Sequence, residues 1–200
     1  MSAYIIPFMV LLNPFALFIY LNSVIEELPR GDFFRVLVKA TGISFIIFSI
    51  FAVFGTAIFE KIWSIRFESF RIFGGIVITA YALIFIIQGR TSFFTLKGTL
   101  DDLAAEIALP FMVGAATVSL SVVIGNSIPL SEAILAILIP LLLNIGVIML
   151  LIVVKYDLLR NRTRVVFDKV VVFFLRLNGF FVGAIGVNLI ITGLENTIKG

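Results

Sequence analysis

The chain has 200 residues, of which 61% are hydrophobic and 14% charged, and its mean hydropathy is +1.20. Soluble domains average about half apolar and about a quarter charged residues, so this composition excludes an ordinary soluble fold and indicates an integral membrane protein. The net charge of +3 lies in short connections between apolar runs and does not indicate a nucleic-acid partner. Because Cys and His are absent, sites that depend on thiolate or imidazole are excluded, and we expect no metal and no cofactor.

Six apolar runs are each long enough to cross the hydrocarbon core, which takes about 20 residues in a helix. Their continuous hydrophobicity predicts an all-α membrane protein with six transmembrane helices in a single membrane domain. No basic stretch precedes the first run, so we expect it to remain as a membrane helix and not to act as a signal peptide. The runs are Ala3–Ser23, Phe34–Phe59, Arg71–Gly89, Ile107–Asn126, Leu130–Tyr156 and Val170–Leu194.

The first run contains Asn13-Pro14-Phe15-Ala16 near its middle. Proline has no N–H and its ring clashes with the preceding turn, so the helix must kink or break there. In lipid, such a break is tolerated only where it is buried in protein or lines a cavity. The new helix N-terminus could hold a carboxylate, which predicts these four residues as substrate ligands. The alternative is a simple kink, in which Asn13 bonds to a freed carbonyl.

The start of the fourth run has a comparable weak point. Paired interruptions in matching segments of two halves indicate a binding site near the membrane midplane. Gly114 permits close approach of the backbone, although small residues are also ordinary packing devices. Ser121 shares a face with Thr117 and either lines a polar path or bonds within its own helix. The residues predicted to bind substrate here are Pro110, Gly114, Ala115, Ala116 and Thr117.

Asn144 and Asn188 lie in the middle of the fifth and sixth runs. A buried amide in lipid must find partners, so we expect hydrogen bonds between helices, with contact to a polar cavity as the alternative. Gly179, Gly183 and Gly186 give the sixth run a flat face, which predicts close helix packing.

The chain divides into halves 1–98 and 99–200, each with three apolar runs. Arg71 and Arg176 open the third run of each half, three residues before a glycine. Three crossings in the first half place the second half in the opposite direction, which predicts two inverted repeats. A boundary arginine near a glycine is common, so the match also has an ordinary explanation.

The distribution of Lys and Arg predicts that both termini lie outside the cell membrane. Eleven cations fall on the side of the connections after the first, third and fifth runs, and four on the other side; the cation-rich side is normally cytoplasmic. The eleven are Arg30, Arg35, Lys39, Arg90, Lys97, Lys155, Arg160, Arg162, Arg164, Lys169 and Arg176, against Lys61, Arg66, Arg71 and Lys199.

No charged residue lies near the centre of a run, so the sequence offers neither a relay of buried carboxylates nor a counter-charge for an ion. Backbone dipoles, amides and hydroxyls remain, and they suit a net-neutral ligand with separated charges. Three other classes stay open. An intramembrane enzyme would need a coupled pair such as Glu106 and Glu132, a scaffold would need no cavity, and a small-solute channel would need a continuous pore.

These motifs resemble the MarC family, also called the neutral amino acid transporter family and grouped with LysE-type exporters. Asn13, Pro14, Pro110 and Gly114 match it residue for residue, and the likeness covers nearly the whole chain in order and spacing. The chain departs from the pattern at Ala16 and Ile19, where the family usually has Gly and a second Pro. It also has Gly114-Ala115-Ala116 where Gly-Pro-Gly is usual.

The resemblance implies a six-helix carrier with two inverted three-helix repeats and discontinuous first and fourth helices. It also implies transport of small neutral amino acids, such as glycine and alanine, across the plasma or inner membrane by alternating access. The expected partners are the amino acid and the lipid bilayer. The sequence leaves open the direction of transport, the coupling ion (proton or sodium), the preferred amino acid and whether a homo-oligomer forms.

Overall fold

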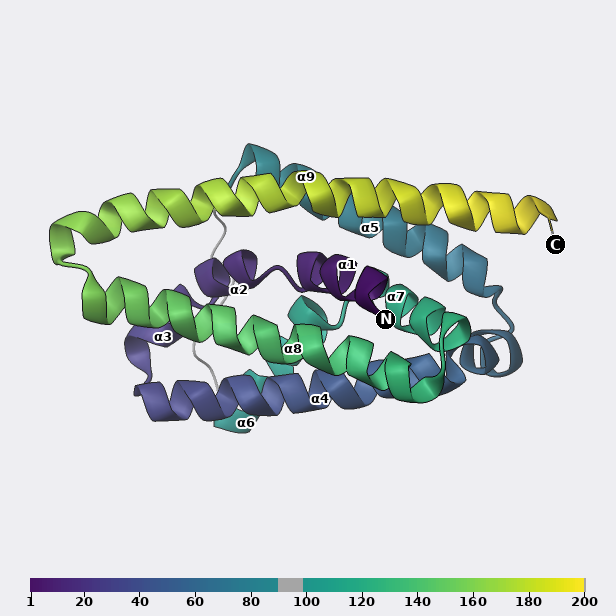
Figure 1. The fold of residues 1–200 in the computed structure, drawn as a ribbon, viewed down its shortest axis with the longest axis horizontal. Coiled ribbons are helices and arrows are strands. Elements are labelled where there is room, and N and C mark those ends of the chain that lie inside the picture. The colour runs from purple at the N-terminus through teal and green to yellow at the C-terminus, as the bar shows by residue number, and fades with distance from the viewer. Residues whose placement is uncertain (90–98, 200) are drawn as a thin grey trace.

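The computed structural model describes residues 1–89 and 99–199, apart from the side chains at positions 110 and 111. All regular structure in these ranges is helical, which confirms the predicted all-α class. The α-helices are α1 (Ser2–Leu12), α2 (Pro14–Tyr20), α3 (Asn22–Glu27), α4 (Arg30–Ala57), α5 (Phe67–Ile87), α6 (Leu100–Glu106), α7 (Ala115–Ser127), α8 (Leu130–Val153) and α9 (Asn161–Lys199) (Figure 1). The π-helical segments η1 (Ile58–Ile62), η2 (Ile107–Met112) and η3 (Val154–Leu158) follow α4, α6 and α8.

Within residues 1–89 and 99–199, five helical stretches are long and apolar enough to cross a membrane, whereas six were predicted. The run 107–126 is divided between η2 and α7, and α7 has only 13 residues. At 1.5 Å per residue α7 spans about 20 Å, short of the roughly 30 Å hydrocarbon core. The five long stretches are Ser2–Tyr20, Arg30–Ile62, Phe67–Ile87, Leu130–Leu158 and Asn161–Lys199.

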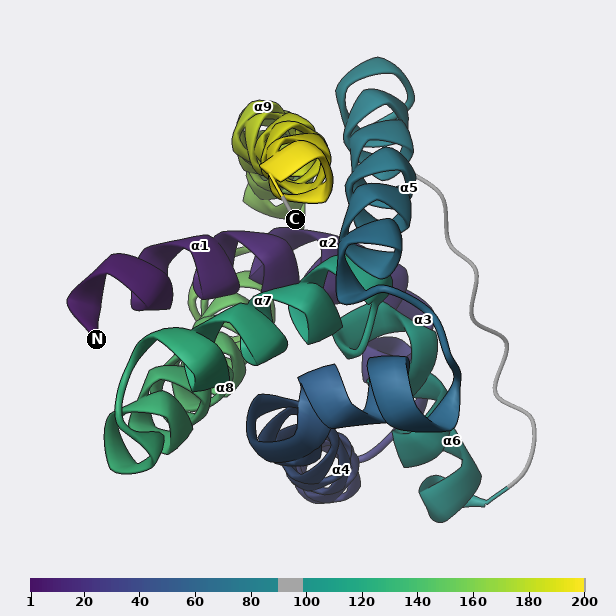
Figure 2. The same cartoon turned by 90° about the vertical axis from the view of Figure 1, so that its right-hand side faces the viewer.

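The helices form three layers, with the broken ones in the middle. In Figure 1, α5 and α9 lie along one side and α4 and α8 along the other, with α1, α2 and α7 between them; Figure 2 shows the same layers end-on. The most extensive contact joins α5 to α9, while α1 packs on α8 and α7 on α4. The interrupted helices therefore lie between two pairs of long helices.

The pattern of buried positions in α4 is repeated 100 residues later in the chain. Each buried residue of α4 has a buried counterpart 100 positions later, in α8 or η3. The two helices follow prolines, Pro29 and Pro129, and run in opposite directions (Figure 1). The pairs are Phe33 and Ala133, Val36 and Ala136, Leu37 and Ile137, Ala40 and Pro140, Thr41 and Leu141, Ser44 and Asn144, Phe48 and Ile148, Ala52 and Ile152, and Gly55 and Lys155. The connection 90–98, where the halves were divided, lies outside the described residues.

Glycines bring α5 and α9 into close contact, as the face of Gly179, Gly183 and Gly186 predicted. A Cβ atom added at Gly75 would lie 2.6 Å from the carbonyl oxygen of Gly186, and one at Gly186 would lie 3.0 Å from that of Gly75. A Cβ at Gly179 would approach the Ala82 carbonyl oxygen to 3.3 Å. In lipid, where helix association depends on packing, such contacts hold the two helices together.

The interface of α4 and α7 is tighter still. A Cβ at Gly125 would lie 1.8 Å from the carbonyl oxygen of Ala52, and one at Gly55 would lie 2.3 Å from a methyl carbon of Val122. The two backbones therefore touch at Gly125, which no larger residue can replace without moving a helix.

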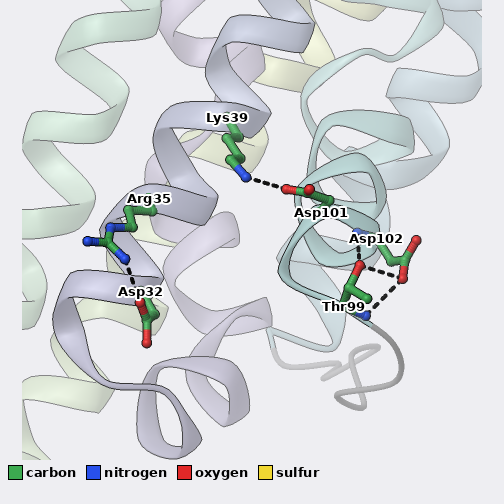
Figure 3. A network of polar contacts seen from close by, with 6 residues as sticks. All are labelled: Asp32, Arg35, Lys39, Thr99, Asp101 and Asp102. Carbon is green, nitrogen blue, oxygen red and sulfur yellow. Dashed lines mark hydrogen bonds and ion pairs between the residues drawn. The ribbon is translucent and has the colours of Figure 1, made fainter.

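A polar network fixes the start of α6 beside α4 (Figure 3). Thr99 caps the helix: its N–H donates to Asp102 Oδ2 at 2.8 Å, and the N–H of Asp102 donates to Thr99 Oγ1 at 3.3 Å. Thr99 donates two hydrogen bonds to the Asp102 carboxylate, and both lower the pKa of Asp102 from its ordinary value. The bond from the Thr99 N–H has the larger effect, and the bond from its hydroxyl the smaller one. Lys39 on α4 pairs with Asp101, which ties the two helices together.

Candidate functional site

The first helix is interrupted at Asn13. This residue ends α1 and begins α2, with φ of 47° and ψ of 74°, a left-handed conformation that Asn tolerates better than most residues. Its Oδ1 accepts a hydrogen bond of 3.1 Å from the N–H of Ala16, and Pro14 occupies the first helical position of α2, where no N–H is needed. The predicted break is present. Asn13 acts as a helix cap, and not as the partner of a freed carbonyl.

The freed carbonyl is bonded from a distant helix. In an intact helix the oxygen of Val10 would accept from the N–H of residue 14, which proline lacks. The side-chain Nδ2 of Asn178, on α9, donates to this oxygen at 3.0 Å. Asn178 was not predicted as a functional residue; the available signal was an amide directly before Gly179 in an otherwise apolar run.

The second interruption lies between η2 and α7, at Val113, which is non-helical, and Gly114, which is extended. The Gly114 N–H donates to Thr117 Oγ1 at 2.9 Å, and that hydroxyl lies 3.0 Å from the carbonyl oxygen of Met112. Thr117 therefore caps α7 and returns a hydrogen bond across the break. This interruption is stabilised locally, whereas the first one needs α9.

Both interruptions border one cavity of about 370 Å³. Six of the predicted substrate ligands line it: Asn13, Ala16, Gly114, Ala115, Ala116 and Thr117. The remaining wall comes from Leu11, Leu12, Leu17, Tyr20, Val77, Ile78, Tyr81, Phe85, Met112 and Val182. The residues around the two breaks, 100 positions apart in the chain, thus meet at one site.

Comparison with known proteins identifies the family of the chain. The model of the MarC family, described as "MarC family integral membrane protein", matches residues 1–198. The chain belongs to the MarC family. A curated relative from Pyrococcus horikoshii, "UPF0056 membrane protein PH0214", is 23% identical over 197 residues, which cover 96% of this chain and 94% of the relative. No solved structure matches the chain.

Membership of the MarC family confirms the resemblance drawn from Asn13-Pro14 and the fourth run. The departures at Ala16 and in Gly114-Ala115-Ala116 do not remove the interruptions. The second break forms at a non-helical Val113 and an extended Gly114, with Thr117 as the cap, and without the usual central proline. MarC is a family of transporter-like membrane proteins and not of enzymes, and several apolar helices fit a multi-pass membrane protein.

The cavity wall does not include Pro14, Phe15 or Ser121. Pro14 is buried, and Phe15 stacks on Phe174 with ring centroids 5.3 Å apart. Ser121 donates to the Thr117 carbonyl oxygen at 2.8 Å, which matches the alternative of bonding within its own helix. The side chain of Pro110 lies outside the described part of the chain.

The two mid-run asparagines differ from each other. Asn144 is fully buried, and neither its Nδ2 nor its Oδ1 has a hydrogen-bond partner within the described chain. Asn188 is exposed on α9, so its expected burial is wrong: it faces away from the packed side that Gly186 and Leu189 form. Neither residue lines the cavity.

The cavity combines apolar walls with hydrogen-bonding groups at the two breaks. Asn13 is 3% exposed, and its Nδ2 is buried with no hydrogen-bond partner among the residues that the structure describes. The carbonyls of Leu11 and Leu12 end α1 and the N–H groups of Ala115 and Ala116 begin α7, so helix geometry leaves all four without a partner in their own helix. No charged side chain is among the lining residues. The site therefore offers donors and acceptors without net charge.

The described residues contain neither the coupled carboxylate pair that an intramembrane enzyme would need nor a group of side chains that could hold a metal ion. Glu106 and Glu132 are both exposed, on α6 and α8, and do not form the buried pair that a membrane-embedded hydrolase would require. Over residues 1–89 and 99–199, no group of three or more acidic side chains is arranged to hold a metal ion.

Asn178→Leu is expected to destabilise the protein by about 1 kcal/mol, because the half-buried carbonyl of Val10 loses its donor. The measurement is the apparent melting temperature of the purified protein, read by size-exclusion chromatography after heating. Asn188→Leu, an exposed amide on the same helix, is the matched control and is expected to leave the melting temperature unchanged. Equal melting temperatures for the two variants would contradict this role of Asn178.

Proposed function

We propose that this chain is a secondary carrier that moves small neutral amino acids, such as glycine and alanine, across the cell membrane by alternating access. The observation that carries the proposal is that both helix interruptions border the same cavity. Discontinuous helices that meet at one cavity are the usual substrate sites of secondary transporters.

A zwitterion fits the groups that the cavity presents. The N-terminus of α7 carries the positive end of a helix dipole, and its N–H groups at Ala115 and Ala116 would bind the substrate carboxylate together with Asn13 Nδ2. The carbonyls of Leu11 and Leu12, at the negative end of α1, would accept hydrogen bonds from the ammonium group. A net charge on the ligand would find no counter-charge, which favours neutral amino acids.

The proposed alternating access rests on two inverted repeats, 1–98 and 99–200. The recurrence of buried positions from α4 to α8 and their opposite directions support this division. The packing of α1 on α8 and of α7 on α4 also relates the halves, because each pair joins the first part of one half to the second helix of the other. Exchange of conformations between such halves would open the cavity to each side in turn.

The orientation proposed is that both termini lie outside. The ends of α3, α8 and η3 and the beginnings of α4 and α9 meet at one end of the molecule (Figure 1). This end carries Arg30, Arg35, Arg160, Arg162 and Arg164, and the positive-inside rule places it in the cytoplasm.

Uptake by proteoliposomes tests the function. Purified protein is expected to exchange labelled glycine or alanine with a saturable rate above that of empty liposomes. Ala115→Leu is expected to abolish exchange, because the larger side chain fills the cavity. Ala80→Leu, at an exposed position of α5, is the control and is expected to keep it. No exchange under proton, sodium or counterflow conditions would contradict the proposal.

A further inference from the structure

Lys155 is a buried cation at the cation-rich end of the molecule. It lies on η3, and its side chain is 8% exposed. The Nζ is 3.0 Å from Asp168 Oδ1 on α9, donates to Asn22 Oδ1 on α3 at 2.8 Å, and lies 5.6 Å from the ring centroid of Phe18. A buried ammonium is costly unless it is paired, and these contacts supply the pairing.

A second cavity, of about 260 Å³, adjoins this cation. Lys155, Asp168, Asn22 and Glu26 contribute to its wall. The short helix α2 separates it from the central cavity: Ala16, Leu17 and Tyr20 line the central one, whereas Phe18 and Ile19 line the second. The two cavities therefore lie on different faces of the same interrupted helix.

The other half of the chain builds the corresponding junction without a buried lysine. Lys155 corresponds to Gly55 in the 100-residue register, and Asn22 corresponds to Val122. Gly55 packs directly on Val122, where an added Cβ would lie 2.3 Å from a methyl carbon. At the positions of Glu26 and Tyr156 this half has Asn126 and Thr56, and the Nδ2 of Asn126 donates to Thr56 Oγ1 at 2.9 Å. The fold can thus close this junction without a buried cation, and Lys155 with its charged partners is a specific feature of one half.

Unused hydrogen-bonding capacity faces this cavity. An ammonium has three N–H donors, and the contacts to Asp168 and Asn22 use two of those of Lys155. Glu26 Oε1 accepts from Asn22 Nδ2 at 2.9 Å and from the hydroxyl of Tyr156 at 3.1 Å, which leaves its second carboxylate oxygen. Asp168 likewise keeps one oxygen beyond its contact with Lys155.

We propose that this second cavity is a binding subsite for the same small zwitterion, with the substrate carboxylate on Lys155 and its ammonium between Asp168 and Glu26. The inference rests on the proposed function and adds a second substrate-binding site, on the cytoplasmic side of α2. A neutral amino acid carries both charges, so it complements a wall that places one cation beside two carboxylates. Movement of α2 would then connect the two cavities.

The number of alanine molecules bound at saturation tests the subsite. The full chain in lipid nanodiscs is incubated with radiolabelled alanine, and bound label is counted per protein. We expect two per chain. The double variant Lys155→Met/Asp168→Asn removes both charges together, so no unpaired buried ion remains, and it is expected to bind one. Lys169→Met, an exposed lysine beside Asp168, is the matched control and is expected to bind two.

Glu26→Gln provides a milder second variant, because Glu26 is exposed and its loss leaves the Lys155–Asp168 pair intact. It is expected to weaken the second binding step by about tenfold, the loss that one charge-assisted hydrogen bond of roughly 1.4 kcal/mol implies. A single alanine per wild-type chain, or two in the double variant, would overturn the subsite and leave the central site standing. Neither binding nor exchange in any form of the protein would overturn the proposed function, and the subsite with it.

Discussion

Asn13→Asp is expected to abolish amino-acid exchange while the protein remains folded. Aspartate keeps an oxygen for the N–H of Ala16 and tolerates the left-handed backbone, so the cap of α2 survives. It removes the Nδ2 donor and places a negative charge at the point where we propose that the substrate carboxylate binds. The measurements are exchange of labelled alanine in proteoliposomes and the apparent melting temperature of the same preparation.

Asn13→Ala separates the two roles of this residue. Alanine loses the cap, worth about 0.5–2 kcal/mol, and must adopt a positive φ, which costs roughly 1–2 kcal/mol. We therefore expect both melting temperature and exchange to fall, in contrast to Asn13→Asp. Asn188→Ala, at an exposed amide, is the control for both measurements. Normal exchange by Asn13→Asp would show that the Nδ2 donor is not part of the substrate site.

Gly125→Ala is expected to destabilise the protein more than the same change at any other described glycine. The new Cβ would lie 1.8 Å from the Ala52 carbonyl oxygen, so α4 and α7 must separate. Overpacking of this kind costs about 1–3 kcal/mol, and a rigid backbone contact favours the upper end. Because α7 carries half of the central site, we also expect weaker alanine binding. The measurements are the melting temperature and equilibrium binding.

Gly146→Ala is the matched control, since it adds the same methyl group to a helix, α8, where nothing lies within 4 Å of the new atom. Replacing a glycine inside a helix by alanine gains about 0.5–1 kcal/mol, so this variant is expected to be at least as stable as the wild type. Equal melting temperatures for Gly125→Ala and Gly146→Ala would contradict the close contact of α4 and α7.

Local chemistry made the central interruptions predictable. Pro14 cannot continue a helix, Asn13 can adopt the left-handed conformation that ends one, and neither property depends on the rest of the fold. The position of the second break followed from Gly114, and Thr117 caps it from within the same segment. The matching halves made it reasonable to expect that the two breaks meet at one cavity. The order of the segments in the chain did not indicate that apolar side chains of α5 would form part of the cavity wall.

Polar partners across long sequence separations were not predictable. Asn178 is one amide among several in apolar runs, and only the docking of α9 brings it to the Val10 carbonyl. Asn188 has the same chemistry in the same helix but lies on the exposed face. The sequence placed Lys155 with the cations on the side of the connection after the fifth run. The structure places it on η3, directly after α8, and buries it against α3 and α9.

The amino-acid sequence by itself determined that this is a membrane protein of the MarC family, built of helices, with its first helix broken at Asn13. Composition and proline stereochemistry act locally and suffice for that. Only the tertiary structure decided that the two breaks border one cavity, that the fourth run is divided between η2 and α7, and that Lys155 is buried beside Asp168. These properties depend on which helix faces meet, and that depends on packing among segments about a hundred residues apart.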